Sequence, residues 1–215
     1  MKNSHINSRI SPRISHISVL LAAICSTALV SAAEPDYAKA ALEMMKADFK
    51  SKGPATMERM VQQDEAQALC SASPQGLKPK IAKKLEQSQL ASVKYPADGQ
   101  YMGDWKNGEK IAQNGRGMQS SDAMGSVNGG NCYACHQMSK TEISFGNIGP
   151  SLYQYGKTRG SSPEILKYTW SKLYNAQAYN ACSRMPRFGH NGVLTEAQLK
   201  DVMALLLDGE SPVNK

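Results

Sequence analysis

Cys132-Tyr133-Ala134-Cys135-His136 is the stretch of this 215-residue chain that says most about its fold. Two thiols three positions apart on an incipient helical turn can each add to one vinyl group of a haem, and the next residue can point its imidazole at the iron. This C-x-x-C-H spacing is the attachment signature of a c-type haem. A dithiol redox pair or half of a zinc site is the competing interpretation, but the chain has no second C-x-x-C. The motif therefore predicts one covalent haem held by Cys132 and Cys135, with His136 as an iron ligand.

A second iron ligand is needed if the haem is to shuttle electrons without binding small molecules. Met185 lies in the stretch 184–189, Arg-Met-Pro-Arg-Phe-Gly, where proline and glycine discourage regular structure, so we expect a loop that can reach across the haem face. His190 competes with it, although an exposed loop imidazole or a partner for a haem propionate is its expected role. Met203 lies inside a helical pattern, and Met138 is too near the motif to reach the opposite side. We therefore predict Met185 as the second ligand.

Hydrophobic periodicity around these motifs indicates helices and almost no strands. Thr195 and Gln198 form a capping-box pair before an apolar stripe that ends near Gly209. Ser162 followed by Pro163 is typical of another helix start. We therefore predict an all-α fold.

The chain before the haem motif divides into two parts. Residues 34–95 are predicted to form a helical extension with no obvious chemistry, because apolar residues recur at helical spacing at 42–49, after Thr56 and at 77–85. Residues 96–215 would form the haem domain, beginning with eight glycines between Gly99 and Gly130 that predict mostly turns and one short helix near residues 108–113. Four methionines of the extension are interpreted as core filler rather than ligands: Met44, Met45, Met57 and Met60.

The first 33 residues have the layout of a cleaved secretory signal peptide. Three basic and no acidic residues precede the apolar stretch 17–30, and small residues separate that stretch from Glu34. A membrane anchor is disfavoured because a spanning helix needs roughly 18 apolar residues. Cys25 suggests a lipid-attachment cysteine, but Ile24 before it is too bulky for that processing site. We expect export to the periplasm, a mature chain that begins at Glu34, and no membrane span.

Charge and composition narrow the choice of partners. Removing the signal peptide takes 3 of the 25 basic residues and none of the 18 acidic ones, which leaves 22 against 18, a net charge of +4. Lysines and arginines are scattered, so binding of nucleic acid is not favoured. A mildly positive docking face for an acidic protein partner is the better interpretation. A chain with 41% hydrophobic and 20% charged residues is an ordinary globular protein rather than a disordered one.

Longer stretches around these motifs resemble class I cytochromes c and, among them, the SoxX family. SoxX proteins are the small monohaem subunits of the SoxAX complexes of bacterial sulfur oxidation. The likeness covers about residues 100–213. The stretches that carry it are Asn131-Cys-Tyr-Ala-Cys-His136, Gly146-Asn-Ile-Gly-Pro-Ser-Leu152, Arg184-Met-Pro-Arg-Phe-Gly189, Leu194-Thr-Glu-Ala-Gln198, Lys200-Asp-Val-Met-Ala-Leu-Leu206 and, specific to SoxX, Ser126-Val-Asn-Gly-Gly130 and Gly209-Glu-Ser-Pro-Val-Asn214.

The resemblance implies a class I cytochrome c fold around one covalent haem, preceded by the helical extension. Cys132 and Cys135 would hold the haem. His136 and Met185 would be its axial ligands, and the Pro150 carbonyl would accept a hydrogen bond that fixes the imidazole. One departure from the class I pattern is the glycine-containing stretch between residues 115 and 131, which displaces the helix that normally runs into the haem motif.

The resemblance also implies partners and a reaction. A SoxA-like haem subunit would form a heterodimer with this chain, and the complex would oxidatively join thiosulfate to a cysteine of the SoxYZ carrier protein, an L-cysteine S-thiosulfotransferase-type activity. This chain would accept the electrons and pass them to a diffusible cytochrome, without being catalytic alone. The alternative is a free-standing soluble periplasmic electron carrier. A haem peroxidase or gas sensor needs an open sixth position and is disfavoured by Met185.

Cys70 and Cys182 are the cysteines that remain in the mature chain. In an exported protein a leftover pair most often forms a disulfide, which here would tie the N-terminal helices to the loop that carries Met185. Two free thiols, or Cys182 as an iron ligand or reactive sulfur, are the alternatives.

Overall fold

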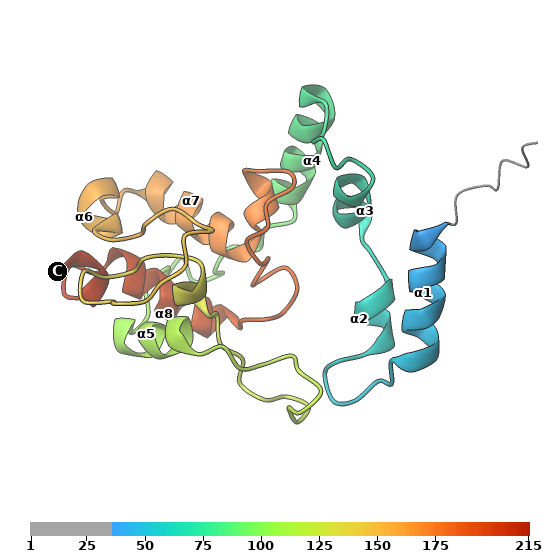
Figure 1. The fold of residues 1–215 in the computed structure, drawn as a ribbon. Helices are drawn as coiled ribbons and strands as arrows, with labels where there is room; N and C mark the ends of the chain where they lie inside the picture. The colour runs from blue at the N-terminus through green and yellow to red at the C-terminus, as the bar shows by residue number, and fades with distance from the viewer. Residues whose placement is uncertain (1–35) are drawn as a thin grey trace, which may run out of the picture. The chain divides into compact units, whose positions relative to one another are not determined.

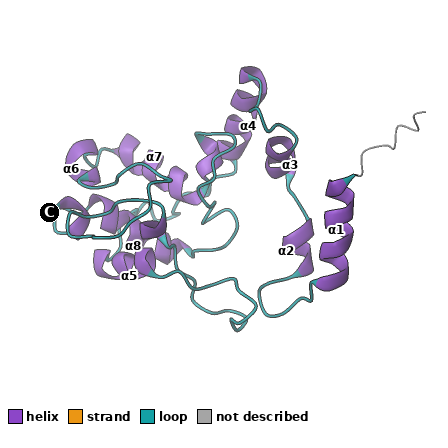
Figure 2. Ribbon diagram, in the orientation of Figure 1, coloured by secondary structure: helices purple, strands orange, loops and turns teal. Residues whose placement is uncertain are grey.

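The computed structural model describes residues 36–215, and the chain divides into two compact units, residues 1–41 and 42–215. The expected signal peptide, with Cys25, lies outside the described residues. Within these residues the regular elements are helical, no strand is present, and one isolated β-bridge joins Lys52 to Ala55 (Figure 2). The all-α prediction is thus confirmed for the part of the chain that the structure describes.

The helices are short and separated by long loops (Figure 1). The α-helices are α1 (Tyr37–Asp48), α2 (Met57–Val61), α3 (Glu65–Ser71), α4 (Pro79–Ala91), α5 (Trp105–Gln113), α6 (Tyr155–Arg159), α7 (Pro163–Tyr174) and α8 (Glu196–Leu207). Three single 3-10 turns are η1 (Cys132–Ala134), η2 (Ala176–Ala178) and η3 (Pro212–Asn214).

Local signals place the starts of the two longest C-terminal helices. At α8 the Thr195 hydroxyl accepts a hydrogen bond from the Gln198 amide, and the Gln198 side chain accepts one from the Thr195 amide, which completes the predicted capping box. At α7 the Ser162 side chain caps the first turn, with Pro163 at the first helical position. The loops before these helices therefore end at defined residues, and the loop before α8 contributes to the site described below.

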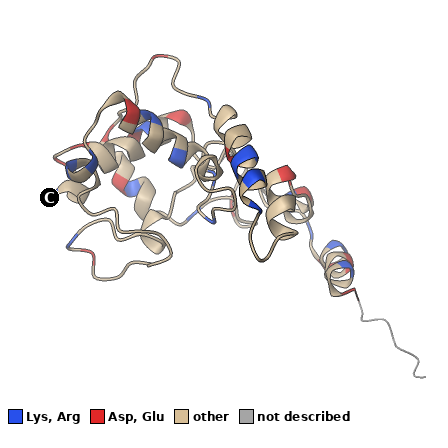
Figure 3. Ribbon diagram, turned by 90° about the horizontal axis from the view of Figure 1, so that it is seen from above, with Lys and Arg blue, Asp and Glu red and all other residues tan. Residues whose placement is uncertain are grey.

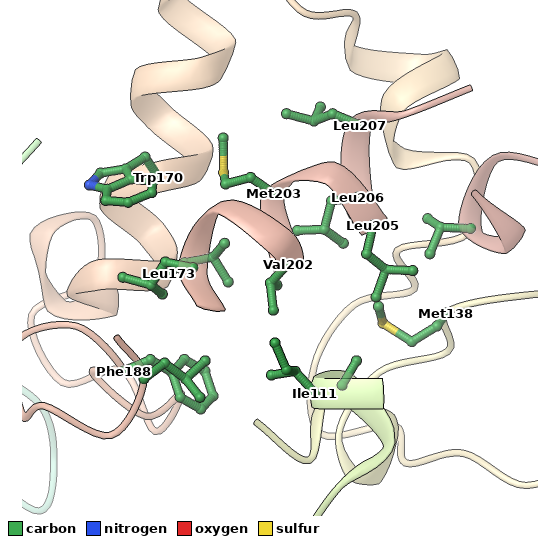
Figure 4. Close-up of a cluster of buried hydrophobic side chains, with 14 of the residues drawn as sticks. Ile111, Met138, Trp170, Leu173, Phe188, Val202, Met203, Leu205, Leu206 and Leu207 are labelled. Atoms are coloured by element: carbon green, nitrogen blue, oxygen red, sulfur yellow. The ribbon is translucent and has the colours of Figure 1, made fainter. Parts of the chain in front are cut away.

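Helix α8 forms the centre of the main hydrophobic core (Figure 4). Leu199, Val202, Met203 and Leu205 of this helix are almost completely buried, and Trp170 of α7 is buried beside them. Each such side chain stabilises the fold by about 1.5–3 kcal/mol relative to an exposed one.

Helix α5 lies against α8 (Figure 1) and approaches it closely at one glycine. A Cβ atom at Gly108 would lie 2.7 Å from the carbonyl carbon of Asp201 and 2.9 Å from Cβ of Leu205, so only glycine fits at this crossing. The predicted short helix near residues 108–113 is therefore the second half of α5.

A second, smaller cluster joins the N-terminal helices to the C-terminal half of the chain. Ala66 of α3, Leu85 of α4 and Ala181 form its buried part. Beside it the buried Asn175 donates its side-chain amide hydrogens to Gln89 at 2.9 Å and to Ser92 at 3.2 Å. Residues 65–95 thus pack on the segment that follows α7, and the predicted domain boundary at residue 95 stays a prediction.

Two methionines of the extension contradict the core-filler prediction. Met44 of α1 is 63% exposed and Met60 of α2 is 47% exposed. Neither α1 nor the five-residue helix α2 has a buried residue. Helical spacing of the methionines therefore does not make them part of a core. The apolar pattern marks these helices correctly but does not say which of their sides is covered.

Charged residues of both signs are interspersed over the described helices (Figure 3). One local group departs from the predicted scatter, because Lys78, Lys80, Lys83 and Lys84 are all exposed around the first turns of α4. No helix among residues 36–215 combines the length and the apolar character needed to cross a bilayer.

The C-terminal turn η3 is part of the core. Asn214 is fully buried, and its side-chain carbonyl accepts hydrogen bonds from the backbone amides of Gly156 and Lys157 at 2.8 and 3.2 Å. Its amide group donates to the carbonyls of Leu206 and Asp208. This side chain therefore fixes α6 against the end of α8.

Candidate functional site

The cysteine motif forms one tight helical turn. The carbonyl of Cys132 accepts hydrogen bonds from the amides of Cys135 and His136 at 3.1 and 2.9 Å, which places the two cysteines on the same side of η1. Asn131 precedes the turn in the left-handed region, with φ 49°, a conformation that asparagine tolerates better than most residues. The turn thus presents both thiols and the imidazole from one short segment.

The glycine-rich stretch before the motif is a loop whose two ends meet. The amides of Gly130 and Asn131 donate to the carbonyls of Ile111 and Asn114 at 2.8 and 3.0 Å, so the motif starts directly beside the end of α5. The backbone of Asn114 lies so close to Gly129 that a side chain there would overlap it. The inserted residues therefore leave the motif next to the helix that precedes it.

The backbone of residues 146–152 runs beside the cysteine motif and is hydrogen-bonded to it. The amides of Gly146 and Gly149 donate to the carbonyls of Tyr133 and Cys135 at 3.0 and 2.8 Å. A Cβ atom at Gly149 would lie 2.5 Å from Nδ1 of His136 and 2.6 Å from its Nε2. Glycine at this position leaves the space that the imidazole ring occupies.

The His136 ring is oriented by one hydrogen bond. Its Nδ1 lies 2.7 Å from the carbonyl oxygen of Pro150. Because a carbonyl oxygen can only accept, Nδ1 carries the hydrogen, and Nε2 is left with a free lone pair. An imidazole held in this way is oriented as a metal ligand through Nε2.

Met185 comes from the loop between η2 and α8, as predicted. Its amide donates to the Ser183 hydroxyl at 3.2 Å, and farther along the loop the amides of Gly189 and His190 donate to the carbonyl of Tyr174. A Cβ atom at Gly189 would overlap the ring of Tyr174, so the loop can pack this closely only with glycine there. The loop is irregular in secondary structure and yet tied to α7.

A disulfide joins Cys70 of α3 to Cys182, with the two sulfur atoms 2.02 Å apart. The same segment is fixed once more, because the Ala181 amide donates to the Glu86 carboxylate of α4 at 3.0 Å. Cys132 and Cys135 are free. The four cysteines that the structure describes thus fall into one bonded pair and one pair of thiols.

A cavity of about 840 Å³ brings the predicted residues together. This volume is within the range of roughly 300–1,000 Å³ that is usual for ligand sites. Residues of η1, the 146–152 loop, α6, α7, α8 and the Met185 loop line the cavity. The predicted site residues among them are Cys132, Cys135, His136, Pro150, Cys182 and Met185.

The competing ligands are placed differently. His190 does not line the cavity; its Nδ1 faces the Ser92 hydroxyl at 3.5 Å. Met203 is fully buried in the core away from the cavity lining, whereas Met138 lines it from a position two residues after His136. The arrangement therefore favours Met185 over the other candidates.

Three cationic side chains of the lining were not predicted from the sequence. Arg159, Lys172 and Arg184 line the cavity, and none of the described acidic residues does. Arg159 lies over the ring of Tyr155, 5.7 Å from its centroid. Burial lowers the pKa of Lys172, against the opposite effect of the Glu86 carboxylate. A group that carries carboxylates suits this lining, and basic residues scattered over three segments give no signal in the sequence.

Two further observations bear on the chemistry of the site. Burial raises the pKa of the free Cys132 thiol to about 12, so this sulfur is a neutral thiol at ordinary pH. Within residues 36–215 no group of three or more histidine, cysteine or acidic side chains is arranged to hold a metal ion. Two thiols, an oriented imidazole and a thioether at one cavity are the donor set that a covalently attached haem would need.

The fold and site define an all-α protein with a cavity built around a C-x-x-C-H turn. No protein-family model matches the chain. A protein of Aquifex aeolicus (strain VF5) called "Uncharacterized lipoprotein" is 35% identical over 196 residues, which cover 89% of this chain and 92% of that protein. The chain belongs to the same family as this Aquifex protein.

Proposed function

We propose that the chain is a monohaem c-type cytochrome that transfers electrons. The observation that carries the proposal is the cavity in which the Cys132 and Cys135 thiols, the oriented His136 imidazole and the Met185 thioether meet. The two thiols would hold the haem through thioether bonds, and the three cationic side chains of the lining would face its carboxylates. A bound haem would supply one-electron redox chemistry at its iron.

The chain's own groups would set how that chemistry proceeds. The Pro150 carbonyl holds the proton on Nδ1 of His136, so in the neutral ring Nε2 is the nitrogen available as a ligand. A thioether from Met185 favours the reduced state and so raises the potential, which suits the accepting end of an electron path. Apolar neighbours such as Leu206 and Phe188 in the cavity lining would contact the apolar part of a bound haem.

We propose a place outside the cytoplasm, in the periplasm, for this protein. The signal-like first 33 residues support export, and the name "lipoprotein" of the Aquifex relative is consistent with it. An oxidising compartment also agrees with a disulfide between Cys70 and Cys182.

Within this class we favour the electron-accepting subunit of a SoxAX-like thiosulfate-oxidising complex. The SoxX-like stretches of the sequence support this choice, as do helices α3 and α4, which a minimal carrier does not require. These helices are tied by the disulfide and by Glu86 to the loop that carries Met185. The expected partners are a SoxA-like haem subunit, the SoxYZ carrier protein and a diffusible cytochrome, and the exposed lysines at the start of α4 would suit an acidic partner surface.

The haem assignment is tested by mass and by ligation. The mature chain, expressed with a haem-attachment system, should carry the added mass of one haem under denaturing conditions. Met185→Ala should abolish the sulfur-to-iron charge-transfer band of the ferric protein, while the matched Met203→Leu variant in the core should keep it. A chain without added haem, or a band that survives Met185→Ala, would contradict the proposal.

The choice between subunit and free carrier is tested with the partner. The chain should elute with a SoxA-like subunit in gel filtration at low and at high salt, because a lasting hetero-complex buries more than about 2,000 Å². The pair, but not the isolated chain, should couple thiosulfate to a carrier cysteine. Separate elution at both salt concentrations, with fast electron exchange to unrelated redox proteins, would favour the free-standing carrier instead.

A further inference from the structure

A second pocket lies apart from the haem cavity and shares none of its lining residues. Its volume is about 390 Å³. The first turn of α2, the start of α3, Met118 and the segment 187–193 after the Met185 loop form its walls. The polar residues of the lining used below are Glu58, Arg59, Asp64, Arg187 and Asn191.

Arg187 is the unusual residue of this pocket, because its side chain is only 6% exposed. Its Nη2 donates to the Asp64 carboxylate at 2.6 Å, but its Nη1 is buried without a hydrogen-bond partner in the part of the chain that the structure describes. A buried donor of a charged group that lacks an acceptor is costly, and native proteins rarely leave one unpaired. Arg187 thus brings to the wall of the pocket a buried guanidinium that is paired on one side only.

A second positive charge in the pocket is not neutralised by a carboxylate. Arg59 donates from Nη1 to the carbonyls of Pro54 and Met118 at 2.7 and 3.2 Å, both of which are neutral acceptors. Among the described residues it forms no ion pair. Arg59 thus brings a full charge to the wall of the pocket, and its remaining nitrogens are donors.

Two acidic residues also line the pocket and reduce its positive charge. Burial would raise the pKa of Asp64, but the hydrogen bonds from the Gln67 amide and from Arg187 outweigh it and hold the pKa below its ordinary value. Asp64 is therefore ionised at neutral pH and neutralises one arginine. Glu58 opposes an anion, so its removal should strengthen anion binding.

We propose that this pocket binds a small oxyanion such as sulfate at the guanidinium of Arg187. Arginine suits such a ligand because its planar fork matches two oxygens of one anion. Arg59 and the exposed amide of Asn191 supply further donors. The site is independent of the haem proposal, since none of its residues lines the haem cavity.

The probe is sulfate, titrated into the isotope-labelled mature chain with its cofactor and followed by two-dimensional NMR. A parallel titration with sodium chloride at equal ionic strength removes the general effects of salt, which sulfate exerts on any protein. We expect saturable shifts of the Asn191 side-chain amide and of the backbone signals of residues 187–193 with sulfate only. A third titration with acetate separates a doubly charged oxyanion from a carboxylate ligand.

Four variants test the proposal, because they should change the dissociation constant for sulfate in different directions. Arg187→Lys, which keeps the charge but loses the fork, should raise the dissociation constant about tenfold. Asn191→Asp, at an exposed position that does not threaten folding, should raise it at least as much. Glu58→Gln should lower it about threefold, because one repelling charge is gone. Arg116→Lys, at an exposed arginine outside both pockets, should leave it unchanged.

Three results would overturn the proposal. The first is equal shifts with chloride and sulfate, which would mean that the pocket has no preference for an oxyanion. The second is sulfate binding that Asn191→Asp and Glu58→Gln do not move in opposite directions. The third is binding of acetate ten times tighter than that of sulfate, which would assign the pocket to a carboxylate.

Discussion

Replacement of Gly149 by alanine tests whether the 146–152 loop positions His136. The backbone φ of Gly149 lies outside the left-handed range, so alanine causes no backbone strain there. The amide that donates to Cys135 is also kept. The only conflict is steric, between the new methyl group and the imidazole ring.

The structure gives the size of that conflict. The methyl carbon would lie 2.5 Å from Nδ1 of His136 and nearer still to Cε1, and ordinary contact begins at 3.4 Å, so the ring must move away by at least about 0.9 Å. A retreat of this size along the bond would stretch the 2.7 Å hydrogen bond to Pro150 to about 3.6 Å, which is no longer a hydrogen bond. Overpacking costs about 1–3 kcal/mol and the lost hydrogen bond about 1 kcal/mol. We therefore expect the free energy of unfolding to fall by about 2–4 kcal/mol.

The assay is guanidinium unfolding followed by tryptophan fluorescence, because Trp170 is buried in the core. Gly209→Ala is the matched control, since a Cβ atom there meets nothing within 4 Å and its φ is also ordinary. The control should stay within about 0.5 kcal/mol of the natural chain. If Gly149→Ala is as stable as Gly209→Ala, the loop does not hold the ring and the reasoning fails.

Three more predictions concern the framework around the site. Serine in place of both Cys70 and Cys182 should lower the free energy of unfolding by up to about 4.8 kcal/mol, the chain-entropy value for a separation of 112 residues, and an unchanged denaturation midpoint would argue against this restraint. Asp64→Asn keeps a capping residue on α3 but loses the ion pair with Arg187, which should cost only about 1 kcal/mol at pH 7 because water screens the half-open carboxylate. Since the folded-state pKa of Asp64 is below 3.8, this cost should be present above pH 3.8 and vanish as the pH falls through the folded-state pKa; a pH-independent difference in urea unfolding would refute it. Gly108→Ala should lower the thermal midpoint by forcing α5 away from α8, at a cost of about 1–3 kcal/mol, and an unchanged midpoint would show that the crossing is loose.

The features that local sequence predicts are those with local causes. The start of α8 follows from Thr195 and Gln198, which are three residues apart, and the start of α7 follows from Ser162 and Pro163. The irregular loop around Met185 follows from the proline and glycine beside it. In each of these places the interacting groups are neighbours in the chain, so no knowledge of the tertiary fold is needed.

The features that local sequence does not predict are assembled from distant segments. Arg159, Lys172 and Arg184 meet at one cavity only because α6, α7 and the Met185 loop are packed together. The pairing of Arg187 with Asp64 joins residues 123 positions apart. The short helices α3 and α6 were also missed, because five to seven residues hold too few apolar positions to show a period.

Cys182 has a consequence for how the protein matures, because it is bonded to Cys70 and also borders the cavity that contains the Cys132 and Cys135 thiols. Four cysteines could therefore pair in more than one way as the protein folds. Under the proposed haem assignment, pairing of Cys182 with Cys70 first would leave a single pair of thiols for haem attachment. Pairing of Cys182 with Cys132 or Cys135 instead would block that attachment until the wrong disulfide is exchanged. On that proposal, the order of disulfide formation and haem attachment would set how much correctly bonded protein is formed.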